Sequence, residues 1–111
     1  MTKIAILVGS TREGSYNQAL AKLAAVQLGK HGATVTEVDL GALDLPIYSD
    51  VLEKSAFPAD ALALKEVLAA QDGLLVVSPE YNGSITALLK NAIDWASRPT
   101  GDESLIALSA F

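Results

Sequence analysis

The stretch "IAILVGSTREGSYNQAL", residues 4–20, sets the fold class of this chain. Ile4 to Val8 is a continuous apolar run that ends at Gly9, a pattern typical of a strand covered on both faces in a parallel sheet. From Ala19 to Leu28 apolar residues recur at helical spacing, and Gly29 follows, where a helix commonly stops. The stretch therefore predicts a buried strand, a polar loop and a helix.

The same alternation continues along the chain. "TVTEVDL" (34–40) is rich in β-branched residues and predicts a second strand near a sheet edge, whereas residues 41–58 carry two prolines and predict a loop. The remaining predicted elements are a helix over 59–71, a strand over 73–78, a helix over 85–97 and a strand over 105–111. This order, β-α-β-α-β-α-β, predicts an α/β fold with a doubly wound parallel sheet, because right-handed crossovers connect such strands.

Composition narrows the class of protein. The 111 residues, half of them apolar, suffice for one core, so we expect a single domain over 1–111. Thirteen acidic against eight basic residues give a net charge of −5, which repels nucleic acid. There is no cysteine, and the aliphatic runs are far shorter than the ~20 residues of a membrane helix. We expect a soluble, cytoplasmic protein with neither nucleic acid nor membrane as partner.

The loop after the first strand fits neither familiar nucleotide motif. Gly9 and Gly14 are spaced as in G-x-x-x-x-G-K-[ST], but Ser15 and Tyr16 stand where that motif has Lys and a hydroxyl residue. The second glycine of G-x-G-x-x-G is also missing, because Thr11 takes its place.

The side chains of this loop instead suit a terminal monophosphate. Ser10, Thr11 and Ser15 supply hydroxyls, Asn17 an amide and Arg12 a guanidinium, next to a helix N-terminus that attracts anions. The alternative needs no ligand, since Ser15 and the residue three positions on, Gln18, form a capping box.

The loop after the third predicted strand, residues 78–84, is built to present its backbone. Pro79 ends the strand pattern, and Gly83 can adopt positive φ or admit a flat ligand close to the main chain. Tyr81 offers an aromatic face, Asn82 an amide, and Ser84 a hydroxyl that can also cap the following helix. A planar heterocycle with hydrogen-bonding edges suits this loop.

Together, "LVGSTREGSYNQAL" (7–20) and "SPEYNGSITALLKNAIDWASRP" (78–99) resemble the NADPH-dependent FMN reductase family, the flavodoxin-like group that includes bacterial chromate and quinone reductases. The resemblance implies strand order 2-1-3-4(-5), FMN as cofactor and NADPH or NADH as electron donor. It implies that the phosphate lies at Ser10, Arg12, Ser15 and Asn17, with Tyr16 beside them, and the isoalloxazine ring at Pro79, Glu80, Tyr81, Asn82, Gly83 and Ser84.

The resemblance implies an NAD(P)H oxidoreductase that passes electrons to a quinone, a free flavin or a metal oxyanion. The alternatives are a flavodoxin-like electron carrier and a truncated, non-catalytic fragment; Arg12 favours the reductase. FMN would carry the chemistry, so no catalytic residue is assigned, and no metal site is expected from the scattered aspartates. We expect a homodimer or homotetramer.

The chain is short for a doubly wound sheet of five strands. A five-stranded sheet of this type needs roughly 150 residues, so the sequence is expected to be truncated after the fourth strand. That strand, with Leu105, Ile106 and Leu108, would then be an exposed edge prone to self-association. His31 follows a helix end and is expected to be structural, and Trp95 is expected to pack in the core or at a subunit contact.

Overall fold

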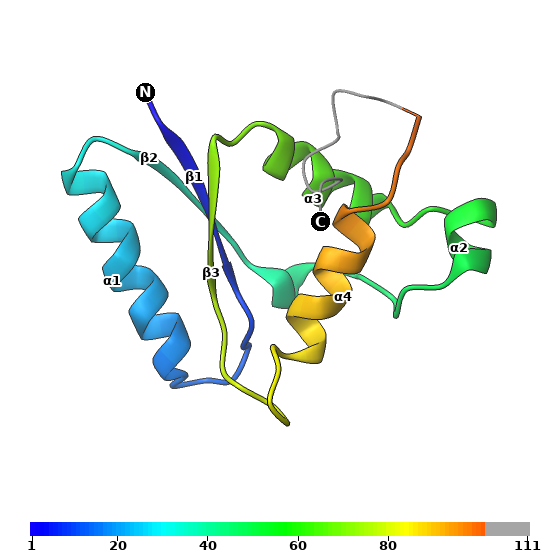
Figure 1. Ribbon diagram of the computed structural model, residues 1–111, viewed down its shortest axis with the longest axis horizontal. Helices are drawn as coiled ribbons and strands as arrows, with labels where there is room; N and C mark the ends of the chain where they lie inside the picture. The colour runs from blue at the N-terminus through cyan, green and yellow to red at the C-terminus, as the bar shows by residue number, and fades with distance from the viewer. Residues whose placement is uncertain (102–111) are drawn as a thin grey trace.

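The computed structural model describes residues 1–101, which form a three-stranded parallel sheet in the order β2-β1-β3 (Figure 1). The strands are β1 (Lys3–Val8), β2 (Thr34–Val38) and β3 (Gly73–Val77). In the central strand, Ala5 lies opposite Thr36 of β2 and Leu74 of β3. This order confirms the predicted α/β fold and the edge position of the second strand. The strand predicted over 105–111 lies outside the described residues.

Helices cover both faces of the sheet (Figure 1). One face packs against α1 (Tyr16–Lys30), and the other packs against α3 (Ala59–Ala69) and α4 (Ala87–Ala96). The central strand serves both cores because its side chains alternate: Ala5 and Leu7 point toward α3 and α4, whereas Ile6 and Val8 point toward α1. All four are buried, which explains the continuous apolar run.

The segment predicted as a plain loop, residues 41–58, contains helical structure, so that prediction was wrong. Asp39 ends β2 early: its carboxylate accepts a hydrogen bond from the Gly41 N–H at 3.1 Å and caps a 3-10 turn, η1 (Leu40–Ala42). A short helix, α2 (Asp50–Ser55), follows with Ser49 as its N-cap. Six residues are too few for a helical period to be visible in the sequence.

The start of α4 also differs from prediction. The helix begins at Ala87 rather than Ile85, and its N-cap is Thr86, whose Oγ1 accepts from the Leu89 N–H at 3.3 Å. Ser84, the predicted cap, is paired through its backbone with Tyr81 and cannot serve. The buried Thr86 therefore fixes where the helix starts.

The segment between β2 and α3 is anchored on α4. The Trp95 Nε1–H donates to the Pro46 carbonyl at 2.7 Å, and the Tyr48 N–H donates to the Asn91 side-chain oxygen at 2.8 Å. The ring centroids of Tyr48 and Trp95 lie 5.0 Å apart. The ring of Phe57 packs edge-on against the same indole, with 5.4 Å between the centroids. Trp95 is fully buried, which confirms its predicted place in the core.

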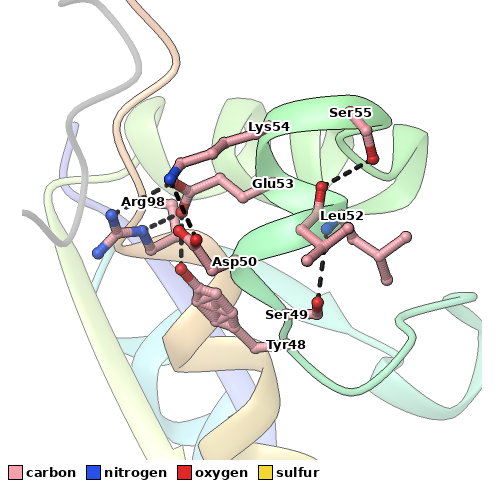
Figure 2. Close-up of polar contacts among 9 residues, drawn as sticks. Tyr48, Ser49, Asp50, Leu52, Glu53, Lys54, Ser55 and Arg98 are labelled. Carbon is pink, nitrogen blue, oxygen red and sulfur yellow. Dashed lines mark hydrogen bonds and ion pairs between the residues drawn. The ribbon is translucent and has the colours of Figure 1, made fainter.

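Figure 2 shows a polar cluster at the same junction, where Tyr48, Glu53 and Arg98 point toward one another. The Tyr48 hydroxyl donates to Glu53 Oε1 at 2.9 Å, and the Arg98 guanidinium pairs with the same carboxylate. The hydrogen bond from Arg98 lowers the pKa of Glu53, whereas burial, followed by the bond to Glu53, raises the pKa of Tyr48. The cluster ties α2 to the end of α4.

One buried cation belongs to the core itself. Lys65 of α3 is 2% exposed, and its Nζ donates to the Ala96 carbonyl at the end of α4 at 2.9 Å. Burial lowers the pKa of this ammonium group. The bond satisfies a carbonyl that the helix end leaves without a partner.

Candidate functional site

The two polar loops singled out in the sequence meet at the carboxyl ends of β1 and β3. The Gly9 N–H donates to the Val77 carbonyl at 2.8 Å, so the two strands end side by side. A Cβ atom added at Gly9 would lie 2.6 Å from Ser78 Oγ and 2.9 Å from Thr86 Oγ1. Glycine at this position therefore permits the two loops to pack directly against each other.

Between the loops lies a hollow of about 270 Å³, called here the strand-end hollow. Its lining residues are Gly9, Ser10, Thr11, Arg12, Tyr81, Thr86, Ala87 and Leu88. Ligands of open parallel sheets bind at this edge, and the volume is just below the roughly 300 to 1,000 Å³ usual for ligand pockets. The structure thus brings Ser10, Arg12 and Tyr81, all named from the sequence, to one hollow.

Hydrogen bonds within the first loop fix its curvature. Ser10 is buried: its Oγ accepts from the Arg12 N–H at 3.4 Å, and its carbonyl accepts from Gln18 Nε2 at 2.6 Å. Ser15 is the N-cap of α1, with its Oγ accepting from the Gln18 N–H at 3.4 Å. The capping box is only half formed, because the Gln18 side chain reaches back to Ser10 instead of the Ser15 N–H.

The donors that remain in the first loop point to an anion. Within residues 1–101, the backbone N–H groups of Thr11, Glu13 and Gly14 have no protein acceptor. The ion pairs of that region use Lys54, Lys90 and Arg98, so Arg12 takes part in none of them. Free N–H groups, a guanidinium and the positive end of α1 together favour a negatively charged group.

Two residues that the sequence grouped with this loop lie apart from the hollow. Tyr16 is 84% exposed at the first position of α1, and Asn17 is half-buried beside it. Neither lines the strand-end hollow. Ser15 does not line it either, and acts through the helix cap.

The second loop is a minimal hairpin. The Tyr81 N–H donates to the Ser84 carbonyl at 2.9 Å, and the Ser84 N–H donates back at 3.1 Å. The two residues between them have positive φ, 54° at Asn82 and 80° at Gly83, the geometry of a type I′ turn. The Glu80 carboxylate accepts from the Gly83 N–H and holds the turn. The turn by itself therefore accounts for the Asn82-Gly83 pair, which is the usual sequence signal of a two-residue hairpin.

Most of the second loop supports the hollow rather than lining it. The lining omits Pro79, Glu80, Asn82, Gly83 and Ser84, and includes Tyr81 alone among the predicted ring-loop residues. The start of α4 contributes Thr86, Ala87 and Leu88, which the sequence did not nominate as site residues. The sequence does carry one signal that points to the start of α4: Thr86 is a hydroxyl residue directly before a helix-forming run, which is typical of an N-cap.

A second hollow, of about 320 Å³, lies away from the strand ends. Its lining includes Pro46, Leu52 and two carboxylates, but Asp60 already accepts from the Asp44 N–H at 2.6 Å. Its lining has no cation, and the carboxylates of Asp44 and Asp60 disfavour an anionic ligand, so the strand-end hollow is the better candidate despite its smaller volume. In residues 1–101 no cluster of three His, Asp or Glu side chains could hold a metal ion. Nor does a helix of that region reach the length and apolarity required to cross a membrane.

The family profile and similar curated relatives point to the same protein family. The profile of the NADPH-dependent FMN reductases matches residues 2–109. The chain is 48% identical over 99 residues to a 2-hydroxy-1,4-benzoquinone reductase from Burkholderia sp, covering 89% of this chain and 52% of that protein. It is 40% identical over 99 residues to a quinone reductase from Escherichia coli (strain K12), covering 86% and 50%.

Among solved structures, the flavoenzyme NAD(P)H:(acceptor) oxidoreductase FerB from Paracoccus denitrificans superposes with a TM-score of 0.78 at 38% identity, covering 94% of this chain and 55% of that one. The chain thus spans about half the length of the curated relatives it matches. The family profile covers nearly all of it, so the predicted resemblance to this family is confirmed. This chain belongs to the NADPH-dependent FMN reductase family.

Proposed function

We propose that the strand-end hollow binds FMN and that the protein is an NAD(P)H-dependent oxidoreductase whose acceptor is a quinone. The observation that carries the proposal is that residues of both predicted loops line one hollow: Ser10, Thr11 and Arg12 of the first loop and Tyr81 of the second. Relatives named quinone reductase support a quinone over a free flavin or a metal oxyanion.

The residues present fit the two ends of FMN. The phosphate would lie at the first loop, where Arg12 and the free N–H groups of Thr11 and Gly14 face no protein acceptor within residues 1–101. Ser10 and Ser15 hold that loop in shape. Tyr16 is left out of the proposed set because it is exposed and outside the hollow, and Asn17 would reach the phosphate only from the helix start.

The ring would lie against the second loop and the start of α4. Ala87 and Leu88 offer apolar surface and Tyr81 an aromatic ring, while the turn from Glu80 to Ser84 holds Tyr81 in place. When bound, FMN supplies the hydride and electron chemistry, and the protein binds and orients it. No side chain of this chain is assigned a proton transfer. We further propose a cytoplasmic enzyme that works as a homodimer or homotetramer.

The test is to mix the purified protein with FMN, NADPH and a benzoquinone. The proposal expects bound yellow flavin and NADPH oxidation that depends on both protein and quinone. Bound flavin without NADPH oxidation would favour the electron carrier. Absence of bound flavin would contradict the proposal for this chain.

A further inference from the structure

The turn η1 (Leu40–Ala42), which follows β2, packs against the loop that forms one wall of the strand-end hollow. A Cβ atom added at Gly41 would lie 2.5 Å from Thr11 Cγ2 and 3.3 Å from Thr11 Cβ. Thr11 lines the hollow, whereas Gly41 does not. The loop after β2 therefore reaches the hollow through Thr11.

Space rather than backbone conformation accounts for glycine at position 41. The φ angle of Gly41 lies outside the positive region that favours glycine, so other residues could adopt its backbone. Glycine is also among the poorest residues in a helical turn. The contact with Thr11 requires the missing side chain, because carbon atoms normally pack at roughly 3.5 to 4.0 Å.

Of the two partners in this contact, η1 is the more firmly held. Leu40 is 2% exposed and packs in the core shared by β1, α3 and α4. In Figure 1 the turn follows β2 and lies beside α4. The Asp39 carboxylate accepts from the Gly41 N–H at 3.1 Å and fixes the turn. Residues 11–14, by contrast, are exposed. Volume added at Gly41 would therefore displace Thr11 and not η1.

The displacement would be large enough to affect the binding of an anion. A contact of 2.5 Å is about 1 Å short of ordinary carbon–carbon packing, whereas binding groups must be held within about 0.5 Å of their working geometry. Thr11 is β-branched, so its side chain has few other rotamers and part of the shift passes to its backbone. The Thr11 N–H has no protein acceptor within residues 1–101, and Arg12 is next in the chain. Both are proposed partners of the phosphate.

We propose that Gly41 is a positioning residue of the phosphate site: by leaving room for Thr11, it holds the anion-binding part of the first loop in its binding geometry. This inference rests on the proposed function, since it concerns the phosphate of FMN. It adds the loop after β2 to the two loops already described, as a support that lies outside the hollow.

Flavin fluorescence titration of Gly41→Ala with FMN and with riboflavin tests the inference. The dissociation constant of FMN should rise roughly five- to hundredfold, as expected for overpacking. That of riboflavin, which has no phosphate, should change by less than about twofold. Gly29→Ala is the matched control, because a Cβ there meets nothing within 4 Å, and it should leave both constants unchanged. Gly41 and Thr11 are exposed, so the variant should fold, and an unchanged circular dichroism spectrum would verify this.

Thr11→Ser tests the contact itself, because it removes the methyl group nearest to Gly41 and keeps the hydroxyl and the backbone N–H. In a Thr11→Ser background, Gly41→Ala should raise the FMN dissociation constant by less than about twofold. The difference between the two backgrounds measures the coupling of the two residues in a double-mutant cycle.

The inference would be overturned by an unchanged FMN dissociation constant in Gly41→Ala, by equal losses of FMN and riboflavin affinity, or by equal losses of FMN affinity in the two backgrounds. In these three cases the wild-type chain still binds FMN, so the proposed function stands. A wild-type chain that binds no FMN would overturn the proposed function and this inference with it.

Discussion

The backbone N–H of Gly9 donates to the carbonyl of Val77 at 2.8 Å, joining the ends of the two strands that precede the two loops of the strand-end hollow. Because Gly9 has no side chain, Ser78 of the second loop and Thr86, the N-cap of α4, pack directly against it. This contact determines the spacing of the two walls of the strand-end hollow.

Gly9→Ala should separate these walls. The added Cβ would lie 2.6 Å from Ser78 Oγ, and such overpacking typically costs about 1 to 3 kcal/mol. We expect weaker FMN binding together with a lower urea midpoint. Gly29→Ala in α1 is the control: a Cβ there meets nothing within 4 Å, and the change should stabilise the fold by about 0.5 to 1 kcal/mol. Equal effects of the two substitutions would contradict the close packing at Gly9.

Arg12→Ala should weaken FMN by roughly ten- to hundredfold and leave riboflavin nearly unchanged, because a hydrogen bond to a charged group contributes about 1.5 to 3 kcal/mol. Flavin fluorescence titration gives both dissociation constants. Lys54→Ala removes an exposed cation elsewhere and serves as the charge control. If the two ligands lose affinity equally, Arg12 does not bind the phosphate.

Gly83→Ala should strain the hairpin, because its φ of 80° costs a residue with a Cβ about 1 to 2 kcal/mol. The turn positions Tyr81, so flavin binding should fall as well. Asn82→Gly keeps the turn geometry and should retain flavin affinity. Urea unfolding and flavin titration of both variants check this, and an unaffected Gly83→Ala would show that the turn is dispensable.

Glu53 should make the free energy of unfolding depend on pH in the acidic range. Its pKa is lowered in the folded state, chiefly by the hydrogen bond from Arg98, so the ionised carboxylate stabilises the fold above its ordinary pKa. That stabilisation is lost as the pH falls through the lowered value. The urea midpoint of Glu53→Gln should therefore fall less than that of the wild type between about pH 7 and about pH 3. Glu66→Gln, on the exposed side of α3, should behave like the wild type; identical slopes for Glu53→Gln and wild type would exclude the effect.

The fold could be predicted because the apolar patterns of its main strands and helices each extend over five or more residues. Ile4 to Val8 reads as a buried strand since helices cover both of its faces. The helix α2 could not be predicted, because its six residues bury no side chain and depend on contacts such as that of Tyr48 with Asn91. Those contacts join residues 43 positions apart, which local periodicity does not reveal.

The sequence predicted the two loops that meet at the candidate site, but it did not predict which residues line the strand-end hollow. The carboxyl ends of parallel strands meet at one edge, which brings Arg12 and Tyr81 to one hollow. The choice of Thr86 over Ser84 as the helix cap depends on the backbone pairing of Ser84 with Tyr81. Ser84 and Thr86 are both hydroxyl residues near the start of the helix, so each is a possible N-cap from the sequence. Only the folded turn distinguishes them.

Hydrogen–deuterium exchange of the protein with and without FMN tests the central claim most directly. A single hollow formed by both loops requires that FMN slow the exchange of amides in residues 9–15 and in residues 79–88 together. Residues 44–60, which surround the larger hollow, should be unchanged. Protection confined to 44–60, or protection of only one of the two loops, would contradict the account.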